Sequence, residues 1–463
     1  MKRRTFVPAW ALSLLAMPLL CGHARAQASA PAPSQADAAT PAPTGFWDRA
    51  SLTGDWGGAR PWLIDRGITL GAVYTDEVLG NVAGGIKQGT IYEGKLELDL
   101  DLDLAKLVGW SDGKIHVSAF QIHGEGLTTG YVGSLATISN IETPPVTVLD
   151  DLYLEQGLLG DRLNIRVGQF AADEEFFVST VAATFINATF GWPTLGTLDL
   201  PGGGPTYPLA TPAIRVRYRP SPGFSVQGAL FSGNPLGNNG NPGGVTFPVD
   251  GIFAIAEAAY TVTPDQKTPG LPAAYKIGAW YDSVRFADLH VDNAGLSLAN
   301  PLSSGDPRQH QGDFAVYGSI DQMLWRRPDT MNGGLASFVR VAVAPQQDRN
   351  PIVFYADAGA TFTGVLPGHD DDVLGLAVSY ANVSSALSSL SRDNILYTGN
   401  QQPIRAAETV LELTYQLPVT PWLILQPDVQ YVFHPGGNAP DPNNPTIAIR
   451  NATIAGLRAT ITF

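Results

Sequence analysis

Charged side chains at alternate positions are the groups in this sequence that are best arranged to act on another molecule. Residues two apart in a β-strand point to the same face. An acidic row with one lysine has this spacing within residues 90–105 and 147–157, and consists of Glu93, Lys95, Glu97, Asp99, Asp101, Asp151 and Glu155. A basic row lies within residues 162–170 and 212–219, and consists of Arg166, Arg215, Arg217 and Arg219. Such guanidinium and carboxylate groups either bind polar groups of a solute or pair with each other.

Signatures of enzyme chemistry are sparse in the chain. The segment His123-Gly124-Glu125-Gly126 resembles an oxyanion loop, but no Gly-x-Ser-x-Gly motif accompanies it. The seven histidines show no metal-ligand spacing. The sequence therefore predicts no catalytic residue, no metal site and no cofactor. Its 42 acidic and 28 basic side chains give a formal charge of −14, which disfavours nucleic acid as a partner.

The charged rows belong to strand-like segments that recur along the whole chain. Residues 96–104 show the pattern most clearly, because a leucine at every second position alternates with a charged residue. Sixteen such segments are predicted at residues 67–78, 90–105, 114–123, 147–157, 162–170, 212–219, 223–232, 250–262, 273–283, 312–325, 335–344, 351–363, 372–383, 404–417, 421–433 and 446–463. Strands of about ten residues separated by turns are typical of transmembrane β-barrels.

Short and long connections alternate between these segments. The tight links include residues 158–161, 220–222 and 418–420. The long loops are predicted at residues 124–146, 171–211, 233–249, 284–311 and 384–403. This segregation is typical of a barrel whose two termini both lie in the periplasm. We therefore predict an all-β fold, a transmembrane antiparallel barrel of about sixteen strands, in the outer membrane of a Gram-negative bacterium.

The amino terminus has the pattern of a secretory signal peptide. Basic residues are followed by an apolar run and then by small residues up to Ala26, after which we expect cleavage. Cleavage there would remove the only cysteine, Cys21. We interpret residues 1–26 as the signal peptide, the Ala- and Pro-rich residues 27–50 as a disordered lead-in, and residues 51–463 as one barrel domain.

A set of motifs at the start of the barrel carries a family resemblance. They include Leu52-Thr53-Gly54-Asp55-Trp56-Gly57-Gly58-Ala59-Arg60, Gln121-Ile122-His123-Gly124 and Gly168-Gln169-Phe170. They resemble the OprB-type carbohydrate-selective porins, densely over residues 52–220 and more loosely to the end. The resemblance implies a sixteen-stranded barrel with a short periplasmic helix, which we place at residues 57–66. It also implies loops folded into the channel and passive diffusion of monosaccharides.

Two sets of side chains could contact a sugar in such a channel. The charged rows would replace water around its hydroxyl groups, or would pair with each other and stiffen the wall. The aromatic candidates are Phe176, Phe177, Phe185 and Trp192 in the long loop, and Trp280 in a strand. Aromatic rings could offer flat faces to the sugar, or could anchor the loop to the wall.

The function predicted from the sequence is that of an outer-membrane porin for small sugars and polyols. Its other expected partners are outer-membrane lipid and lipopolysaccharide, and both a monomer and a homotrimer remain open. A general diffusion porin is one alternative. A secreted polysaccharide-binding β-protein is another, because a soluble sheet with one buried face shows the same alternation.

Overall fold

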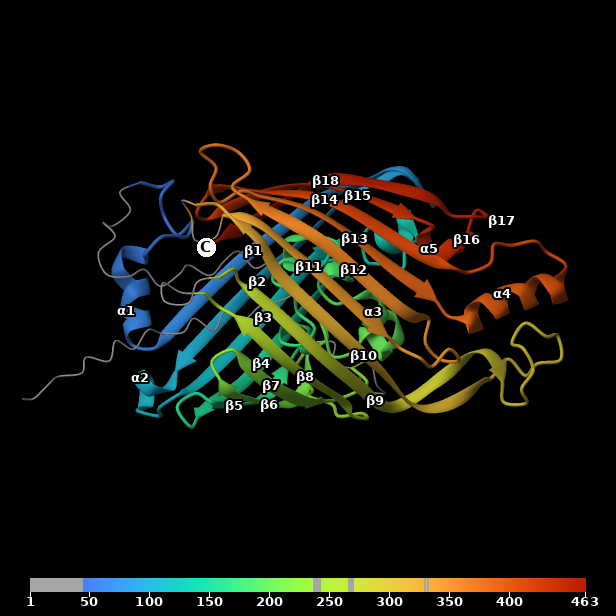
Figure 1. The fold of residues 1–463 in the computed structure, drawn as a ribbon, viewed down its shortest axis with the longest axis horizontal. Helices are drawn as coiled ribbons and strands as arrows, with labels where there is room; N and C mark the ends of the chain where they lie inside the picture. Colours follow the sequence, from blue (N-terminus) through green and yellow to red (C-terminus); the bar gives the residue numbers. More distant parts are fainter. Residues whose placement is uncertain (1–44, 236–242, 265–269, 329, 331–332) are drawn as a thin grey trace, which may run out of the picture.

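The computed structural model describes residues 45–235, 243–264, 270–328, 330 and 333–463, so the predicted signal peptide lies outside the described residues. Sixteen antiparallel strands close into one barrel, in which β1 pairs with both β2 and β18 (Figure 1). The barrel strands are β1 Ile68–Gly85, β2 Gly89–Asp103, β3 Gly113–Gly124, β4 Val146–Leu158, β5 Leu163–Phe170, β6 Thr211–Ser221, β7 Phe224–Phe231, β8 Phe253–Val262, β9 Ala273–Asp292, β10 Pro307–Arg326, β11 Gly334–Val343, β12 Ile352–Thr363, β13 Val373–Val383, β14 Ala407–Thr420, β15 Leu423–Phe433 and β18 Arg450–Thr462.

The remaining elements are short and lie in the connections. A separate two-stranded sheet pairs β16 (Pro440–Asp441) with β17 (Asn444–Ala448). The α-helices are α1 Ala59–Asp65, α2 Leu104–Val108, α3 Thr194–Asp199, α4 Ser385–Thr398 and α5 Pro435–Asn438. Single helical turns are η1 Trp56–Gly58, η2 Thr128–Val132, η3 Ala172–Glu174, η4 Ala182–Thr184, η5 Ala188–Phe190 and η6 Pro201–Gly203. None of the helices in the described part of the chain is long and apolar enough to cross a membrane.

The alternation in the sequence determines which face of each strand points outward. In β2, Leu98 is 48% exposed, whereas its neighbour Glu97 is 3% exposed and faces the interior. The same division holds on β6, where Val216 is exposed and Arg215 is buried. The outside of the barrel is therefore an apolar surface suited to lipid, and the inside is polar and charged. The predicted all-β barrel and its sixteen strands are confirmed.

The hairpin β9–β10 differs from the sequence-based expectation. Residues 284–311 were expected to be a loop, but β9 continues to Asp292 and β10 begins at Pro307. The two strands remain paired there, from Asp282 opposite Asp313 to Asp292 opposite Pro307, with two register shifts. These bulges interrupt the strict alternation, which explains why the sequence pattern did not reveal the extension.

The two ends of the barrel differ, and we name them by their connections. The turn end holds the short turns, α1, α2 and the C-terminus, whereas the loop end holds α4 and the tip of the β9–β10 hairpin (Figure 1). The predicted short helix is present as α1, and Arg60 on it donates a hydrogen bond to the Phe463 carbonyl (2.8 Å). The helix ends at Asp65, and Gly67, two residues further on, has a φ of +87° that favours glycine. Next to α1, Trp47 stacks on Trp422.

The outward position of Leu98 in the middle of β2 can be tested by substitution. Leu98→Arg would place a charge against the lipid, at a cost of about 2–4 kcal/mol near the bilayer midplane. Thr90→Arg lies on the same outward face but close to the loop end, and should cost at most about 1 kcal/mol. Urea titrations of the protein in lipid vesicles would measure both free energies of unfolding. Equal losses for the two variants would contradict this placement of β2 in the membrane.

Candidate functional site

The predicted acidic row lies on the inner wall near the first strands. Lys95 and Glu97 form a buried ion pair of 3.0 Å, and Glu93 beside them is 2% exposed. Three other members lie around one imidazole, since His116 lies 3.9 Å from Asp99, 2.7 Å from Asp101 and 3.7 Å from Asp151. Lys95 is thus paired with Glu97, and His116 of β3 lies among carboxylates of β2 and β4.

The predicted basic row divides into a buried part and a rim part. Arg166 on β5 and Arg215 on β6 lie directly opposite each other, and both are fully buried. Glu155 on β4 accepts from both guanidinium groups at 3.0 Å. Arg219 instead pairs with Asp161 at 3.2 Å in the turn between β4 and β5. The sequence row therefore splits between the inner wall and the turn end.

Glu175 completes the buried arginine pair and comes from a loop rather than from the wall. It lies 3.0 Å from Arg166 and 2.8 Å from Arg215. Burial tends to raise the pKa of the Glu175 carboxyl, but Arg166, Arg215 and the half-buried Arg217 together lower it below its ordinary value. Two like charges opposite each other are thus held by two carboxylates, one of which ties a loop to the wall.

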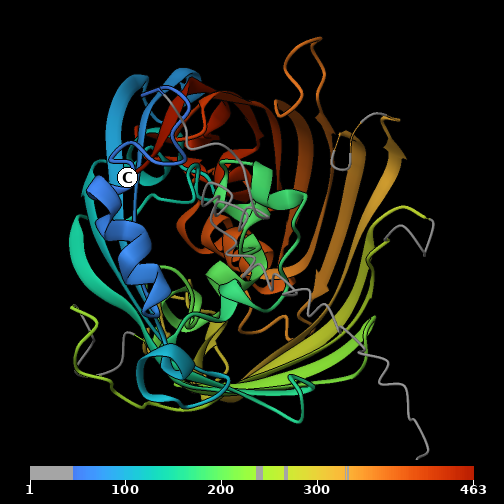
Figure 2. The same cartoon turned by 90° about the vertical axis from the view of Figure 1, so that its left-hand side faces the viewer.

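The loop that carries Glu175 covers residues 171–210, and we call it the second inner loop. Figure 2, seen from the turn end, shows this green segment with α3 inside the ring of strands. Carboxylates of the wall accept hydrogen bonds from its backbone. Glu257 on β8 accepts from the Phe177 N–H (2.9 Å), and Asp321 on β10 accepts from the Thr180 N–H (2.9 Å).

Contacts with β11 and β14 hold the rest of the second inner loop. Glu412 on β14 accepts from the backbone N–H groups of Ile186 (2.6 Å) and Asn187 (2.9 Å). The buried Arg340 on β11 donates to the carbonyls of Thr189 (3.0 Å) and Gly191 (2.8 Å). The sequence analysis did not single out Glu257, Asp321, Arg340 or Glu412. The sequence signal that could have found them is their inward-facing position in strands with alternating polar and apolar residues.

A second loop, residues 125–145, also folds inward, and we call it the first inner loop. Glu408 on β14 accepts from the N–H groups of Leu135 (2.7 Å) and Ala136 (2.8 Å). The two inner loops bond to each other, because the Asn140 N–H donates to the Ile186 carbonyl (2.8 Å). The two inner loops are therefore joined to each other by backbone hydrogen bonds inside the barrel.

The predicted aromatic candidates have different surroundings. Phe177 stacks on Tyr317 with ring centroids 4.2 Å apart, Phe176 contacts Phe231, and Phe185 contacts Phe338. These three loop phenylalanines are at most 4% exposed, so their rings fix the loop against the wall. Trp280 packs on Phe253 with ring centroids 5.8 Å apart. Apart from Trp192, none of the sequence candidates belongs to the lining of the cavity that the described residues form between the two inner loops.

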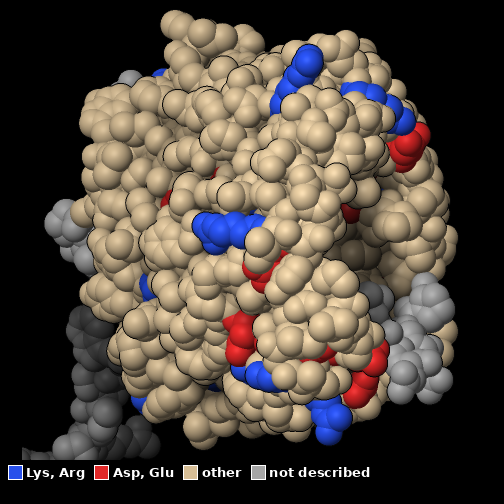
Figure 3. All heavy atoms as spheres, turned by 90° about the vertical axis from the view of Figure 1, so that its right-hand side faces the viewer, with Lys and Arg blue, Asp and Glu red and all other residues tan. Residues whose placement is uncertain are grey.

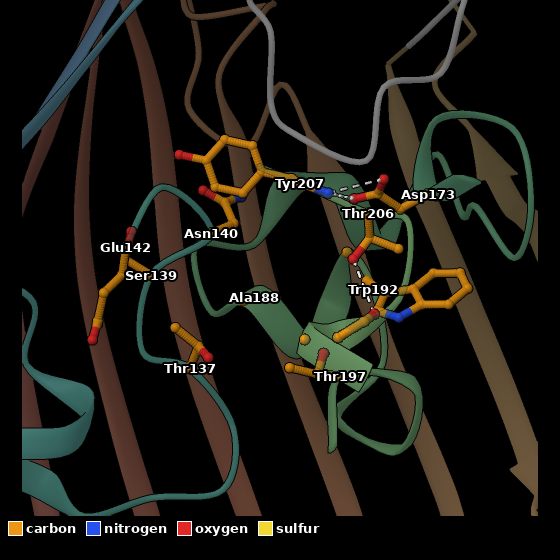
Figure 4. A pocket seen from close by; sticks show the side chains of 13 residues that line it. Thr137, Ser139, Asn140, Glu142, Asp173, Ala188, Trp192, Thr197, Thr206 and Tyr207 are labelled. Atoms are coloured by element: carbon orange, nitrogen blue, oxygen red, sulfur yellow. Dashed lines mark hydrogen bonds between the residues drawn. The ribbon is translucent and has the colours of Figure 1, made fainter. Parts of the chain in front are cut away.

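Trp192 does border free space, a cavity between the two inner loops that is partly open to solvent. Figure 4 shows Glu142, Ser139 and Asn140 on one side of it and Trp192, Thr206 and Asp173 on the other. The lining residues are Thr137, Ser139, Asn140, Glu142, Asp173, Ala188, Gly191, Trp192, Thr197, Gly202, Gly203, Thr206 and Tyr207. Hydroxyl, amide and carboxyl groups therefore surround an indole ring. Sequence reasoning found only Trp192 of this set, because the two loops meet only after folding.

The polar groups of the cavity differ in how far they are already bonded. Asp173 accepts from the Tyr207 N–H, and Glu142 accepts from the Thr128 hydroxyl (2.7 Å). Within the described part of the chain, the buried Trp192 Nε1 has no hydrogen-bond partner. Burial raises the pKa of both carboxyls, that of Asp173 to about 7. The cavity can donate to and accept from a polyhydroxylated molecule.

The buried arginine pair should control both stability and loop position. Arg215→Met would leave Glu155 and Glu175 with Arg166 alone, at a cost of about 3–5 kcal/mol. The loosened second inner loop should raise the single-channel conductance in planar bilayers. Arg219→Met, also on β6, removes an exposed pair and should cost at most about 1 kcal/mol without changing the conductance. If Arg215→Met left both conductance and stability intact, the anchoring role of the pair would be disproved.

The raised pKa of Asp173 predicts a pH dependence of stability. Its ordinary pKa is 3.8 and burial raises it to about 7, so between these values the folded chain binds more protons than the unfolded chain. The stabilisation from this carboxyl is therefore full below about pH 4 and is lost as the pH rises to about 7, by roughly 4 kcal/mol at most. Asp173→Asn should remove this slope from urea titrations at several pH values. Asp65→Asn, on the exposed side of α1, is the control and should keep the pH dependence. If the pH dependence survived in Asp173→Asn, it would come from another group.

Comparisons with known proteins agree with this geometry. The family model of the carbohydrate-selective porins, OprB family, matches residues 87–463. Porin B of Pseudomonas aeruginosa is 24% identical over 444 residues, which cover 89% of this chain and 91% of that protein. The high-pH structure of Pseudomonas putida OprB is 25% identical, covers 90% of this chain and 100% of that chain, and superposes with a TM-score of 0.81. The low-pH structure of the same protein has a TM-score of 0.55 at 20% identity, with 90% and 99% covered. The chain belongs to the OprB family of carbohydrate-selective porins, which are outer-membrane channels and not enzymes.

Proposed function

We propose that small sugars cross the outer membrane through the cavity between the two inner loops, and that Trp192 is the principal group that contacts them. The proposal rests on one observation: Trp192 Nε1 is a buried donor without an acceptor in the described structure, and it borders a cavity lined by hydroxyl and carboxyl groups. Indole and hydroxyl groups together offer a flat apolar face and directional hydrogen bonds, which match the two faces of a pyranose.

The carboxyls of the cavity suit hydroxyl groups as partners. Glu142 and Asp173 come from different inner loops, and both belong to the cavity lining. A protonated carboxyl donates and accepts, whereas an ionised one only accepts, so both states can bond to a sugar hydroxyl. An anion would meet at least one repelling carboxylate when they are ionised. The cavity therefore favours neutral polyols over anions of equal size.

The charged rows of the wall take a supporting part in this proposal. Arg166 and Arg215 each pair with Glu155 and with Glu175, and thereby position the second inner loop. Lys95 and Glu97 likewise pair with each other. We assign Glu93, Asp99, Asp101 and Asp151 to the polar wall along which sugars approach the cavity. In this proposal the selectivity for sugars arises in the cavity between the loops, and the polar wall lines the water-filled approach to it.

We further propose that the turn end faces the periplasm and the loop end faces the outside. The support is the segregation of connections, since β6 and β7 are joined only by Pro222 and Gly223 at the turn end. Barrels of this class place short turns in the periplasm and long loops outside. In this orientation α1 and Phe463 lie on the periplasmic side, and the exposed apolar residues contact lipid.

Liposome swelling would test the proposed transport. Vesicles that contain the protein should swell in isotonic glucose and other small sugars faster than in anions of matched size. Equal rates for sugars and anions would indicate a general diffusion porin instead. An absence of swelling in every solute would contradict the channel itself.

Two substitutions would test the role of Trp192. Trp192→Phe keeps an aromatic ring but removes the Nε1 donor, and we expect a loss of about threefold to tenfold in the preference for sugars over anions, the equivalent of about 0.7–1.4 kcal/mol. Gly196→Ala on α3 would place its Cβ 2.5 Å from Trp192 Nε1, so the indole must move. Trp110→Phe, at the exposed turn end, is the matched control and should leave the preference unchanged. If Trp192→Phe and Gly196→Ala both kept the normal preference, Trp192 would not contact sugar.

A further inference from the structure

The loop end brings together one histidine and two aspartates from three separate segments. His310 lies near the start of β10, Asp288 near the end of β9, and Asp348 in the connection between β11 and β12. His310 Nε2 lies 2.8 Å from Asp288 Oδ2 and 3.6 Å from Asp348 Oδ2. One nitrogen and one oxygen from each carboxylate all lie within 4.8 Å of one another.

We propose that these three residues bind a divalent transition-metal ion of the zinc class, which joins the β9–β10 hairpin to the connection between β11 and β12. Imidazole nitrogen and carboxylate oxygen are ligands that zinc and its neighbours accept. Three protein ligands leave a coordination position for water, so the site is of the open type. The proposal concerns the loop end and is independent of the sugar pathway.

The spacing of the ligand atoms fits such an ion. In a tetrahedral zinc site with bonds of about 2.0–2.2 Å, neighbouring ligand atoms lie about 3.3–3.6 Å apart. The distance of 3.6 Å from His310 Nε2 to Asp348 Oδ2 lies at the upper limit of this range, and the distance of 2.8 Å to Asp288 Oδ2 lies about 0.5 Å below it. A displacement of about half an ångström at Asp288 would admit the ion. His310 Nε2, which lies at hydrogen-bond distance from Asp288, would then bind the metal.

The surroundings of the three residues orient their ligand atoms. Asp288 Oδ1 accepts from the N–H groups of His290 and Val291, both at 2.8 Å, which leaves Oδ2 directed at His310. Arg349 Nε donates to Asp348 Oδ1 at 2.8 Å, and Arg349 Nη2 donates to Asp348 Oδ2 at 3.3 Å. A carboxylate oxygen has two lone pairs, so this contact leaves a position for a metal. Outer hydrogen bonds of this kind are typical of metal sites.

Charge and access also permit the ion to bind. With a neutral imidazole, the two carboxylates carry two negative charges, which Arg349 offsets only by one. Asp288 is 5% exposed at its side chain, His310 17% and Asp348 42%, so one side of the cluster is open to solvent. Figure 3 views this loop end, where charged side chains appear in only a few places among uncharged residues. A hydrated cation can therefore reach the cluster from outside the barrel.

Isothermal titration of the purified, EDTA-treated protein in detergent with ZnCl₂ would test this site. We expect one equivalent to bind, with affinity reduced at least tenfold in both His310→Ala and Asp348→Asn. Titration with CoCl₂ should give visible absorption bands of a nitrogen- and oxygen-bound cobalt, and these bands should disappear in His310→Ala. His369→Ala removes a histidine beside Asp372 between β12 and β13, and it should leave both signals unchanged.

The outcomes separate a built site from other binding. The Asp348 side chain is partly exposed, and Asp348→Asn keeps its shape, so this variant is expected to fold even if His310→Ala does not. Heat-modified mobility on gels would confirm the barrel in each variant. No saturable binding of zinc or cobalt would overturn the proposal. So would one equivalent that binds equally well to wild type and to the folded Asp348→Asn variant. Normal sugar transport without metal would not affect it.

Discussion

The interior of this barrel depends on hydrogen bonds between charged side chains of the wall and the backbone of the two inner loops. A long loop enclosed by a sheet carries peptide groups away from bulk water, and each one left unpaired costs about 1–3 kcal/mol. Glu408 and Glu412 supply acceptors for such groups, and Arg340 supplies donors. Because these side chains stand on rigid strands, they determine where the loops lie.

The same arrangement explains why the arginine and acidic rows do not form an open constriction of free charges. Arg166 and Arg215 are fully buried and share Glu155 and Glu175. A buried cation without a partner is very unfavourable, so an arginine of this wall needs a carboxylate close by. Arg166 and Arg215 thus form ion pairs at the wall, whereas the cavity between the loops is lined by other polar groups, among them Glu142 and Asp173.

The sequence predicted the barrel well because the side-chain alternation of a strand has a strict period of two. Leu98 and Glu97 show this on β2, because a shift of one residue along the strand moves a side chain from the lipid-facing side to the lumen. The extension of the β9–β10 hairpin was not predicted, because bulges near Asp282 and Gln309 break the period. The helix before β1 was predicted, since Gly67 marks its end within the chain itself.

The site was predicted less completely, for the physical reason that its contacts cross the barrel. Trp192 stood out by its residue type, but Glu142 reaches the same cavity from another loop, and no local spacing relates the two. The proposed metal site shows the same limitation, since His310 and Asp348 lie far apart in the sequence but 3.6 Å apart in the structure. Sequence periodicity describes one strand at a time, whereas these sites depend on which strands become neighbours.

A passive channel must bind its solute strongly enough to admit it and weakly enough to release it. Most polar groups of the cavity are already bonded within the protein: Asp173 to the Tyr207 N–H, and Glu142 to Thr128. A sugar there exchanges hydrogen bonds with water for a few hydrogen bonds with the loops, so its net gain is small. The same hydrogen bonds that hold the loops in place therefore keep the binding weak, and a rigid cavity can remain a conducting one.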